Sequence, residues 1–150
     1  MTQSLYPDII SPAEINGERP GLLPLGAFVE AGWPVPTEGY GRESLDLQRL
    51  CLRNPAETYF LKACGDSMAS AGIYDGDLLV VDRSEAARPG KVVIAAVDGE
   101  LTIKRLRKRE ERLFLCPENF DNPNFREIDI TGQDDVCIWG VVTYCLHALK

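Results

Sequence analysis

Ser67 is the first residue of this chain whose surroundings suggest chemistry. It lies in the run Cys64-Gly65-Asp66-Ser67-Met68, which follows a strand-like segment and precedes several small residues. A serine at such a turn can be exposed at a cleft, with nearby backbone amides free to donate to an oxyanion. Gly-Asp-Ser is also an ordinary turn sequence, so the motif alone does not distinguish a nucleophile from a simple turn.

A nucleophilic serine needs a base, and the chain contains one histidine, His147. This residue stands near the end of an apolar segment, where we expect a structural role, so a histidine-based triad is poorly supported. A lysine can replace histidine if its surroundings disfavour the charged form. Lys104 meets that condition best, because strand alternation places it on one face with Thr102 and Leu106. Taken alone, it also fits a strand lysine whose amine reaches water.

The elements that would position these residues are mainly β. Segments rich in β-branched and aromatic residues, with turn signals between them, predict strands at 58–63, 78–82, 91–97, 100–108, 112–116, 126–131 and 136–147. Asp98-Gly99 predicts a two-residue hairpin turn directly before the strand that carries Lys104. Ser44 is expected to cap one short helix, which Asn54-Pro55 ends.

The chain is expected to consist of an arm and one folded domain. Six prolines fall between residues 1 and 41, which favours an extended segment. Residues 42–150 are predicted to form a compact, mainly β domain. A chain of 150 residues with 45% hydrophobic content can bury a core without the support of a metal or of disulfides.

Charge argues against a protein that binds DNA strongly by itself. The formal net charge is -7, whereas binding through phosphate neutralisation requires a basic face. A basic cluster does run from Lys104 to Arg112, but Glu110 and Glu111 interrupt it. We interpret it as a solvated strand end and turn, with a weak nucleic-acid or partner patch as the alternative.

Cysteine usage and hydropathy define the expected environment. The five cysteines form no Cys-x-x-Cys pair, so we expect reduced, mostly buried thiols, and neither a metal nor a cofactor. The longest apolar runs are far shorter than the roughly 20 residues of a membrane-spanning helix. The first residues also lack the features of a signal peptide. These observations predict a soluble, cytoplasmic protein.

Three segments, taken together, resemble one family. They are Gly65-Asp66-Ser67-Met68, residues 72–82 (GIYDGDLLVVD) and residues 93–106 (VIAAVDGELTIKRL). In these segments, and from about Gly26 to the C-terminus, the chain resembles UmuD and the LexA-type self-cleaving repressors. Ser67 and Lys104 lie 37 residues apart, as the family pattern requires. The resemblance implies a LexA/UmuD-like C-terminal β domain in which Ser67 is the nucleophile and Lys104 the general base.

The same resemblance implies a cleavage site in the arm. Members of the family cut themselves between a small residue and glycine, and residues 28–36 (FVEAGWPVP) match that position, with Ala31-Gly32 as the bond. A bond with little side-chain bulk can enter a tight cleft, and glycine adopts backbone conformations that other residues resist. We therefore expect a serine–lysine autopeptidase that releases residues 1–31.

Partners are implied by the resemblance alone. It implies that a RecA filament on single-stranded DNA stimulates cleavage. It also implies that the trimmed homodimer joins a UmuC-like Y-family DNA polymerase in translesion synthesis. No association with a membrane is expected. A LexA-like repressor would need a helix-turn-helix domain before the cut, for which residues 1–31 are too short and proline-rich. A signal-peptidase-like enzyme would need a membrane anchor. A non-catalytic β-domain adaptor, with Ser67 and Lys104 as surface residues, is the remaining alternative.

Overall fold

The computed structural model describes residues 23–24 and 44–149 of the chain. These residues belong to two units. Within residues 16–53, the short strands β1 (Leu23–Pro24) and β2 (Ser44–Leu45) pair antiparallel, and helix α1 (Leu47–Cys51) follows. From Asn54 onward the described chain forms a second unit, which contains both predicted catalytic residues.

Helix α1 starts later than the sequence predicts. Asp46 is its N-cap, and the Asp46 carboxylate accepts a hydrogen bond of 3.1 Å from the amide of Arg49. The prediction that Ser44 is the cap is wrong, because Ser44 lies in β2 opposite Pro24. An aspartate two residues further on offers the same kind of acceptor to the first turn of the helix.

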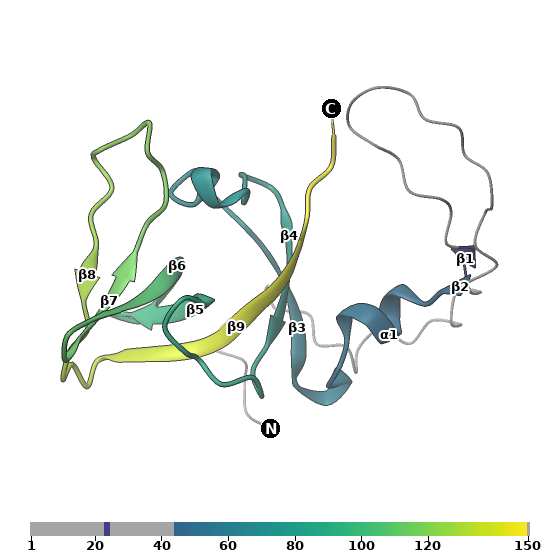
Figure 1. Ribbon diagram of the computed structural model, residues 1–150, viewed down its shortest axis with the longest axis horizontal. Coiled ribbons are helices and arrows are strands. Elements are labelled where there is room, and N and C mark those ends of the chain that lie inside the picture. The colour runs from purple at the N-terminus through teal and green to yellow at the C-terminus, as the bar shows by residue number, and fades with distance from the viewer. Residues whose placement is uncertain (1–22, 25–43, 150) are drawn as a thin grey trace. The chain divides into compact units, whose positions relative to one another are not determined.

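The second unit is built on one antiparallel sheet of seven strands, in the order β3-β4-β9-β5-β6-β7-β8 (Figure 1). Strand β9 runs through its middle, between β4 and β5. The strands are β3 (Thr58–Lys62), β4 (Leu78–Asp82), β5 (Val92–Val97), β6 (Glu100–Arg109), β7 (Arg112–Cys116), β8 (Ile128–Asp129) and β9 (Val136–Leu146).

The mainly β prediction is therefore confirmed, and most strand bounds agree within one residue. The exception is the segment 126–131, of which only Ile128–Asp129 is a strand. The predicted hairpin between β5 and β6 is present, with Asp98 at φ 51° and Gly99 at φ 81°. Two consecutive residues with positive φ are the conformation that a tight two-residue hairpin turn demands.

Both faces of the central strands are buried. Along β5, Ile94 enters one apolar cluster with Leu79 and Val81, whereas its neighbours Val93 and Ala95 enter another. The pairing register of β9 shifts by one residue against both β4 and β5. Such bulges bend a strand and increase its twist, so one sheet can fold around two clusters.

Gly140 marks the closest approach in this central region. It lies in β9 opposite Ile94, next to the point at which the register with β5 shifts. A Cβ atom at this position would lie 2.6 Å from Cγ1 of Val81. Glycine is therefore required by the packing of β9 on β4, and not by its own backbone angles.

Candidate active site

Ser67 lies in the turn between β3 and the short 3-10 helix η3 (Ala69–Ala71). Gly65 opens this turn with φ +87°, and its amide donates to the Asp75 carboxylate at 2.7 Å. Met68, the residue after Ser67, is only 2% exposed and belongs to the first apolar cluster. A left-handed glycine on one side and a buried side chain on the other fix the turn and leave Ser67 partly exposed.

Lys104 reaches Ser67 from the neighbouring hairpin. It lies on β6 directly opposite Val93, which is fully buried in the second cluster. The Lys104 Nζ atom lies 3.2 Å from Ser67 Oγ. The fold thus brings the two predicted catalytic side chains into hydrogen-bonding distance although 37 residues separate them in the sequence.

Two further oxygen atoms surround the same amine. Lys104 Nζ donates to Thr102 Oγ1 at 2.9 Å and to the carbonyl oxygen of Ile103 at 3.0 Å. A lysine ammonium has three N–H donors, so these two acceptors and Ser67 Oγ satisfy all of them. Thr102 shares the face of β6 that the sequence assigned to Lys104, but its role as a hydrogen-bond partner was not predicted.

Burial shifts the pKa of this lysine. Lys104 is partly buried, and removal from water lowers the pKa of its amine below the ordinary value for lysine. No described carboxylate makes an ion pair with Lys104, and its hydrogen-bond partners are all neutral oxygens. The site therefore favours a neutral amine more than an exposed lysine position does.

The turn also has free hydrogen-bond donors. Within the part of the chain that the structure describes, the amide N–H groups of Ser67 and Met68 donate to no acceptor. Such amides can stabilise negative charge on an oxygen next to the Ser67 hydroxyl. A nucleophile, a weakly basic amine and available amide donors are the parts that acyl transfer requires.

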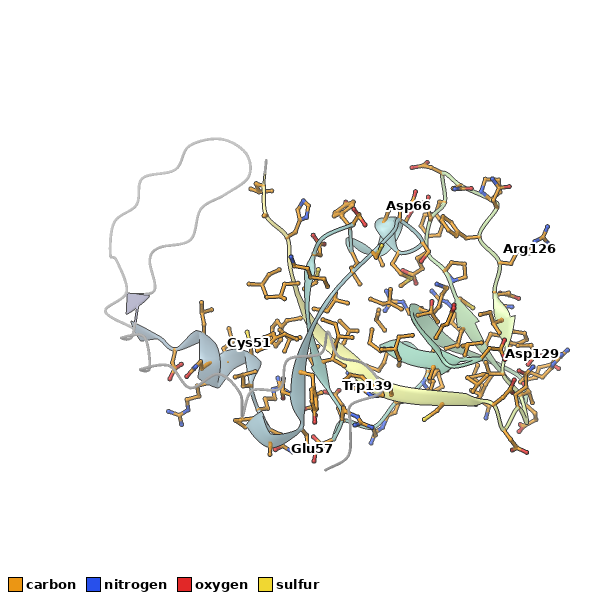
Figure 2. The ribbon with its side chains drawn as sticks, turned by 180° about the vertical axis from the view of Figure 1, so that it is seen from behind. Cys51, Glu57, Asp66, Arg126, Asp129 and Trp139 are labelled. Carbon is orange, nitrogen blue, oxygen red and sulfur yellow. The ribbon has the colours of Figure 1, made fainter. Side chains whose placement is uncertain are left out.

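A segment that the sequence analysis did not single out holds this turn in place. After β7, the backbone of Glu118 bonds to that of Ser67 and Ser70, and the Asn119 side chain bonds to Asp66. Figure 2 shows Asp66 beside the loop that leaves β7. The signal that was available is a glutamate two residues after a predicted strand, close in sequence to a cluster of arginines.

That basic cluster is less solvated than predicted. Arg105 and Arg107 both pair with the buried Glu118, Arg109 pairs with Glu127, and Arg112 pairs with Asp129. The interpretation as a simple solvated strand end is therefore wrong for Arg105, whose side chain is only 26% exposed.

The other residues considered in the sequence lie elsewhere. His147 makes a contact of 2.5 Å with the buried Asp77, in agreement with the expected structural role. Ala31 and Gly32 lie outside the described residues. The cysteines are free, but Cys64 and Cys137 are exposed, so the expectation of mostly buried thiols is wrong.

Neither a metal-binding cluster nor a membrane-spanning helix occurs among the described residues. In residues 23–24 and 44–149, no three His, Cys, Asp or Glu side chains are grouped so that they could hold a metal ion. None of the helices in that same part of the chain combines the length and the apolar character needed to cross a membrane.

The described fold is a mainly β domain in which Ser67 and Lys104 lie within hydrogen-bonding distance of each other. Residues 24–143 match the model of the family described as Peptidase S24-like. The chain therefore belongs to the peptidase S24-like family.

Curated relatives place it within that family. The chain is 44% identical to Protein ImpA of Salmonella typhimurium over 140 residues, 93% of each chain. It is 46% identical to Protein MucA of Escherichia coli over 118 residues, 79% of each. The LexA repressor of Xylella fastidiosa is 40% identical over 124 residues, which are 82% of this chain and 56% of the repressor. The resemblance to UmuD is thus confirmed: the chain is a UmuD-like protein of SOS mutagenesis, with the chemistry of a self-cleaving serine peptidase.

Proposed function

We propose that Ser67 and Lys104 form the catalytic pair with which this protein cuts its own chain between Ala31 and Gly32. The observation that carries the proposal is the 3.2 Å contact between Lys104 Nζ and Ser67 Oγ, at an amine whose pKa is lowered by burial. A lysine with an ordinary pKa is almost fully protonated at neutral pH and cannot accept a proton. Burial therefore supports the role of Lys104 as general base.

The first chemical step is acylation. Neutral Lys104 takes the proton from Ser67, and Ser67 Oγ attacks the carbonyl carbon of Ala31. The free amides of Ser67 and Met68 stabilise the oxyanion of the tetrahedral intermediate. When this intermediate collapses, the bond from Ala31 to Gly32 breaks, and the Lys104 ammonium gives its proton to the departing amine of Gly32.

The second step is hydrolysis. Lys104, neutral again, takes a proton from water, and the water oxygen attacks the ester that joins Ala31 to Ser67. Collapse of the second intermediate returns the proton to Ser67 Oγ and releases residues 1–31. Because the substrate belongs to the same polypeptide, or to the other subunit of a dimer, each Ser67 acts once, and docking of the arm controls the reaction.

The neutral acceptors around Lys104 have a part in this mechanism. A neutral amine has two N–H donors and one lone pair. If Thr102 Oγ1 and the Ile103 carbonyl oxygen accept the two remaining hydrogens, the lone pair points at the Ser67 hydroxyl. Thr102 thus orients the base and does not itself react.

The biological setting of the proposal follows the family. A RecA filament on single-stranded DNA stimulates cleavage, and the trimmed homodimer, residues 32–150 in each subunit, acts with a UmuC-like Y-family polymerase. The net charge of -7 supports a connection to DNA through protein partners in place of direct strong binding. We place this activity in the cytoplasm, where the DNA and its polymerases are found.

The decisive experiment follows the mass of the purified full chain. At alkaline pH, and at neutral pH with activated RecA, we expect loss of residues 1–31 and appearance of the 32–150 fragment. Ser67→Ala and Lys104→Ala are expected to abolish both reactions. Ser84→Ala and Lys108→Ala serve as matched controls, because they remove a serine and a lysine that lie outside the pair.

Three results would contradict the proposal. A chain that stays intact under both conditions would favour the non-catalytic adaptor. Cleavage at another bond would exclude Ala31-Gly32. Cleavage that survives Ser67→Ala would assign the reaction to another nucleophile.

A further inference from the structure

We propose that Glu118 is a positioning residue of this reaction, which ties the strand that carries Lys104 to the turn that carries Ser67. The inference rests on the proposed function of these two residues. It concerns a residue that touches neither the reacting hydroxyl nor the amine, but that contacts both of the elements that present them.

The backbone of Glu118 holds the turn. Its amide donates to the Ser67 carbonyl oxygen at 2.8 Å, and its carbonyl oxygen accepts from the Ser70 amide, also at 2.8 Å. The next two residues add to this contact: Asn119 Nδ2 donates to the Asp66 carbonyl oxygen at 2.8 Å, and the Phe120 amide donates to Ser70 Oγ at 2.9 Å. The turn that carries Ser67 is therefore hydrogen-bonded to residues 118–120 on both sides of Ser67.

The side chain of Glu118 holds the strand. Arg105, the residue next to Lys104 on β6, donates to its carboxylate through Nε at 2.6 Å and through a terminal nitrogen at 3.0 Å. Arg107 donates to the same carboxylate at 2.9 Å. These bonds hold the pKa of Glu118 below its ordinary value. The carboxylate is therefore charged at neutral pH and keeps its bonds to Arg105 and Arg107.

One residue thus joins the two halves of the catalytic pair. Ser67 lies on a loop and Lys104 on a strand, and their separation depends on how the loop sits against β6. The Glu118 side chain is only 10% exposed, so water cannot easily replace its bonds to the arginines. Misplacement of reacting groups by an ångström can reduce a rate by about a hundredfold, so a link of this kind has kinetic consequences.

A neighbouring ion pair provides a matched control. Arg109, on the same strand, makes a bidentate pair with Glu127 at 2.7 and 2.8 Å. The Glu127 side chain is 43% exposed, and neither member of the pair makes a hydrogen bond to residues 66–70 in the described part of the chain. Glu118→Gln and Glu127→Gln make the same chemical change, one inside the proposed link and one outside it.

The test is the pH profile of self-cleavage of the full chain, measured together with the melting temperature of each variant. On the alkaline plateau Lys104 is neutral in every variant, so a lower plateau rate reports geometry and not protonation. We expect Glu118→Gln to lower the plateau at least about tenfold at a temperature well below its melting point. We expect Glu127→Gln to stay within about twofold of the unmodified chain.

Other outcomes would overturn the inference. A Glu118→Gln plateau equal to that of the unmodified chain would do so, as would equal losses in both variants, because equal losses indicate a general effect of charge or stability. If Glu118→Gln does not fold, Asn119→Ala removes the bond to Asp66 without removing a charge, and an unchanged plateau in that variant would reject the link.

Failure of the proposed function has a different signature. In that case the unmodified chain itself fails to cleave, or Ser67→Ala cleaves as fast as the unmodified chain. Ser67-dependent cleavage with no effect of Glu118→Gln would leave the catalytic pair in place and remove only the role of Glu118.

Discussion

Replacement of Thr102 by valine tests how the surroundings of Lys104 control its protonation. Valine keeps the shape of threonine but removes the Oγ1 atom that accepts a hydrogen bond from Lys104 Nζ at 2.9 Å. The change leaves both proposed catalytic residues in place. It alters only the relative stability of the charged and neutral forms of the Lys104 amine, and the orientation of that amine.

The expected size of the effect follows from the two charge states. A hydrogen bond from an ammonium is worth about 1.5–3 kcal/mol, and one from a neutral group about 0.5–1.5 kcal/mol. Loss of the acceptor therefore destabilises the charged form by roughly 1 kcal/mol more than the neutral form, which corresponds to slightly less than one pKa unit. Because Lys104 is partly exposed, water offsets part of this loss. We expect the pKa of Lys104 to fall by about half a unit.

The rate should respond in two opposing ways. A lower pKa raises the neutral fraction of Lys104 below the inflection of the pH profile. Loss of one orienting bond, worth about 0.5–1.5 kcal/mol, lowers the plateau by roughly two- to tenfold. Thr102→Val is thus expected to cleave much more slowly than the unmodified chain at alkaline pH, and at nearly the same rate near neutral pH.

The assay is the rate of formation of the 32–150 fragment, followed by mass between pH 6 and 11. Thr143→Val is the control, since Thr143 donates to the Val80 carbonyl oxygen at 3.2 Å within the same sheet and is not one of the described hydrogen-bond partners of Lys104 Nζ. The pH profile of Thr102→Val should have its inflection at lower pH than that of the unmodified chain. An inflection at the same or a higher pH would refute the proposed effect of Thr102 on the pKa of Lys104. So would a plateau in Thr102→Val equal to that of Thr143→Val.

Three further predictions concern the rest of the domain. Gly140→Ala should destabilise the fold by about 1–3 kcal/mol, since its Cβ would lie 2.6 Å from Val81, and thermal unfolding should show a melting temperature lower by ~5 °C or more. Burial alone would raise the pKa of Asp77, but bonds from the Tyr74 amide, His147 and Cys145 outweigh burial and hold this pKa below the ordinary value for aspartate. The folded state then binds fewer protons than the unfolded state, so unfolding measured against pH should show stability lost as pH falls from about 5 through the folded pKa, and Asp77→Asn should flatten that part of the curve. Burial and Asp77 raise the pKa of Cys145 to about 11, so a thiol reagent at pH 8 should modify the exposed Cys64 and Cys137 rapidly and Cys145 slowly, as peptide mass mapping would show.

Local patterns predicted the sheet well, because alternation and turn residues act over a few positions. The strand bounds at 78–82 and 112–116 agree with the structure, and Asp98-Gly99 forms the expected hairpin. The helix cap was misplaced because Ser44 and Asp46 are both good caps. The choice between them depends on the pairing of Ser44 with Pro24, which local sequence does not reveal.

The candidate site was predictable only in part. Strand alternation placed Lys104 beside Thr102, but its contact with Ser67 came from the family resemblance and not from any local rule. Glu118 was missed because its contacts join residues far apart in the chain, from Asp66 and Ser67 on one side to Arg105 and Arg107 on the other. The basic cluster was treated as solvated, whereas the fold pairs Arg105 and Arg107 with the buried Glu118.

If Lys104 is the general base that we propose, its surroundings explain how a chain that carries its own substrate can remain intact. Three neutral oxygens satisfy the ammonium, the form that cannot act as a base, whereas burial favours the neutral amine that can. Since the amine is only partly buried, further loss of water raises its neutral fraction. A segment that docks over the pair would therefore supply the scissile bond and activate the base in one event. Docking would then affect the cleavage rate in two ways, through the position of the scissile bond and through the neutral fraction of Lys104. The pH profile of Thr102→Val measures how Thr102 alone affects the protonation of Lys104.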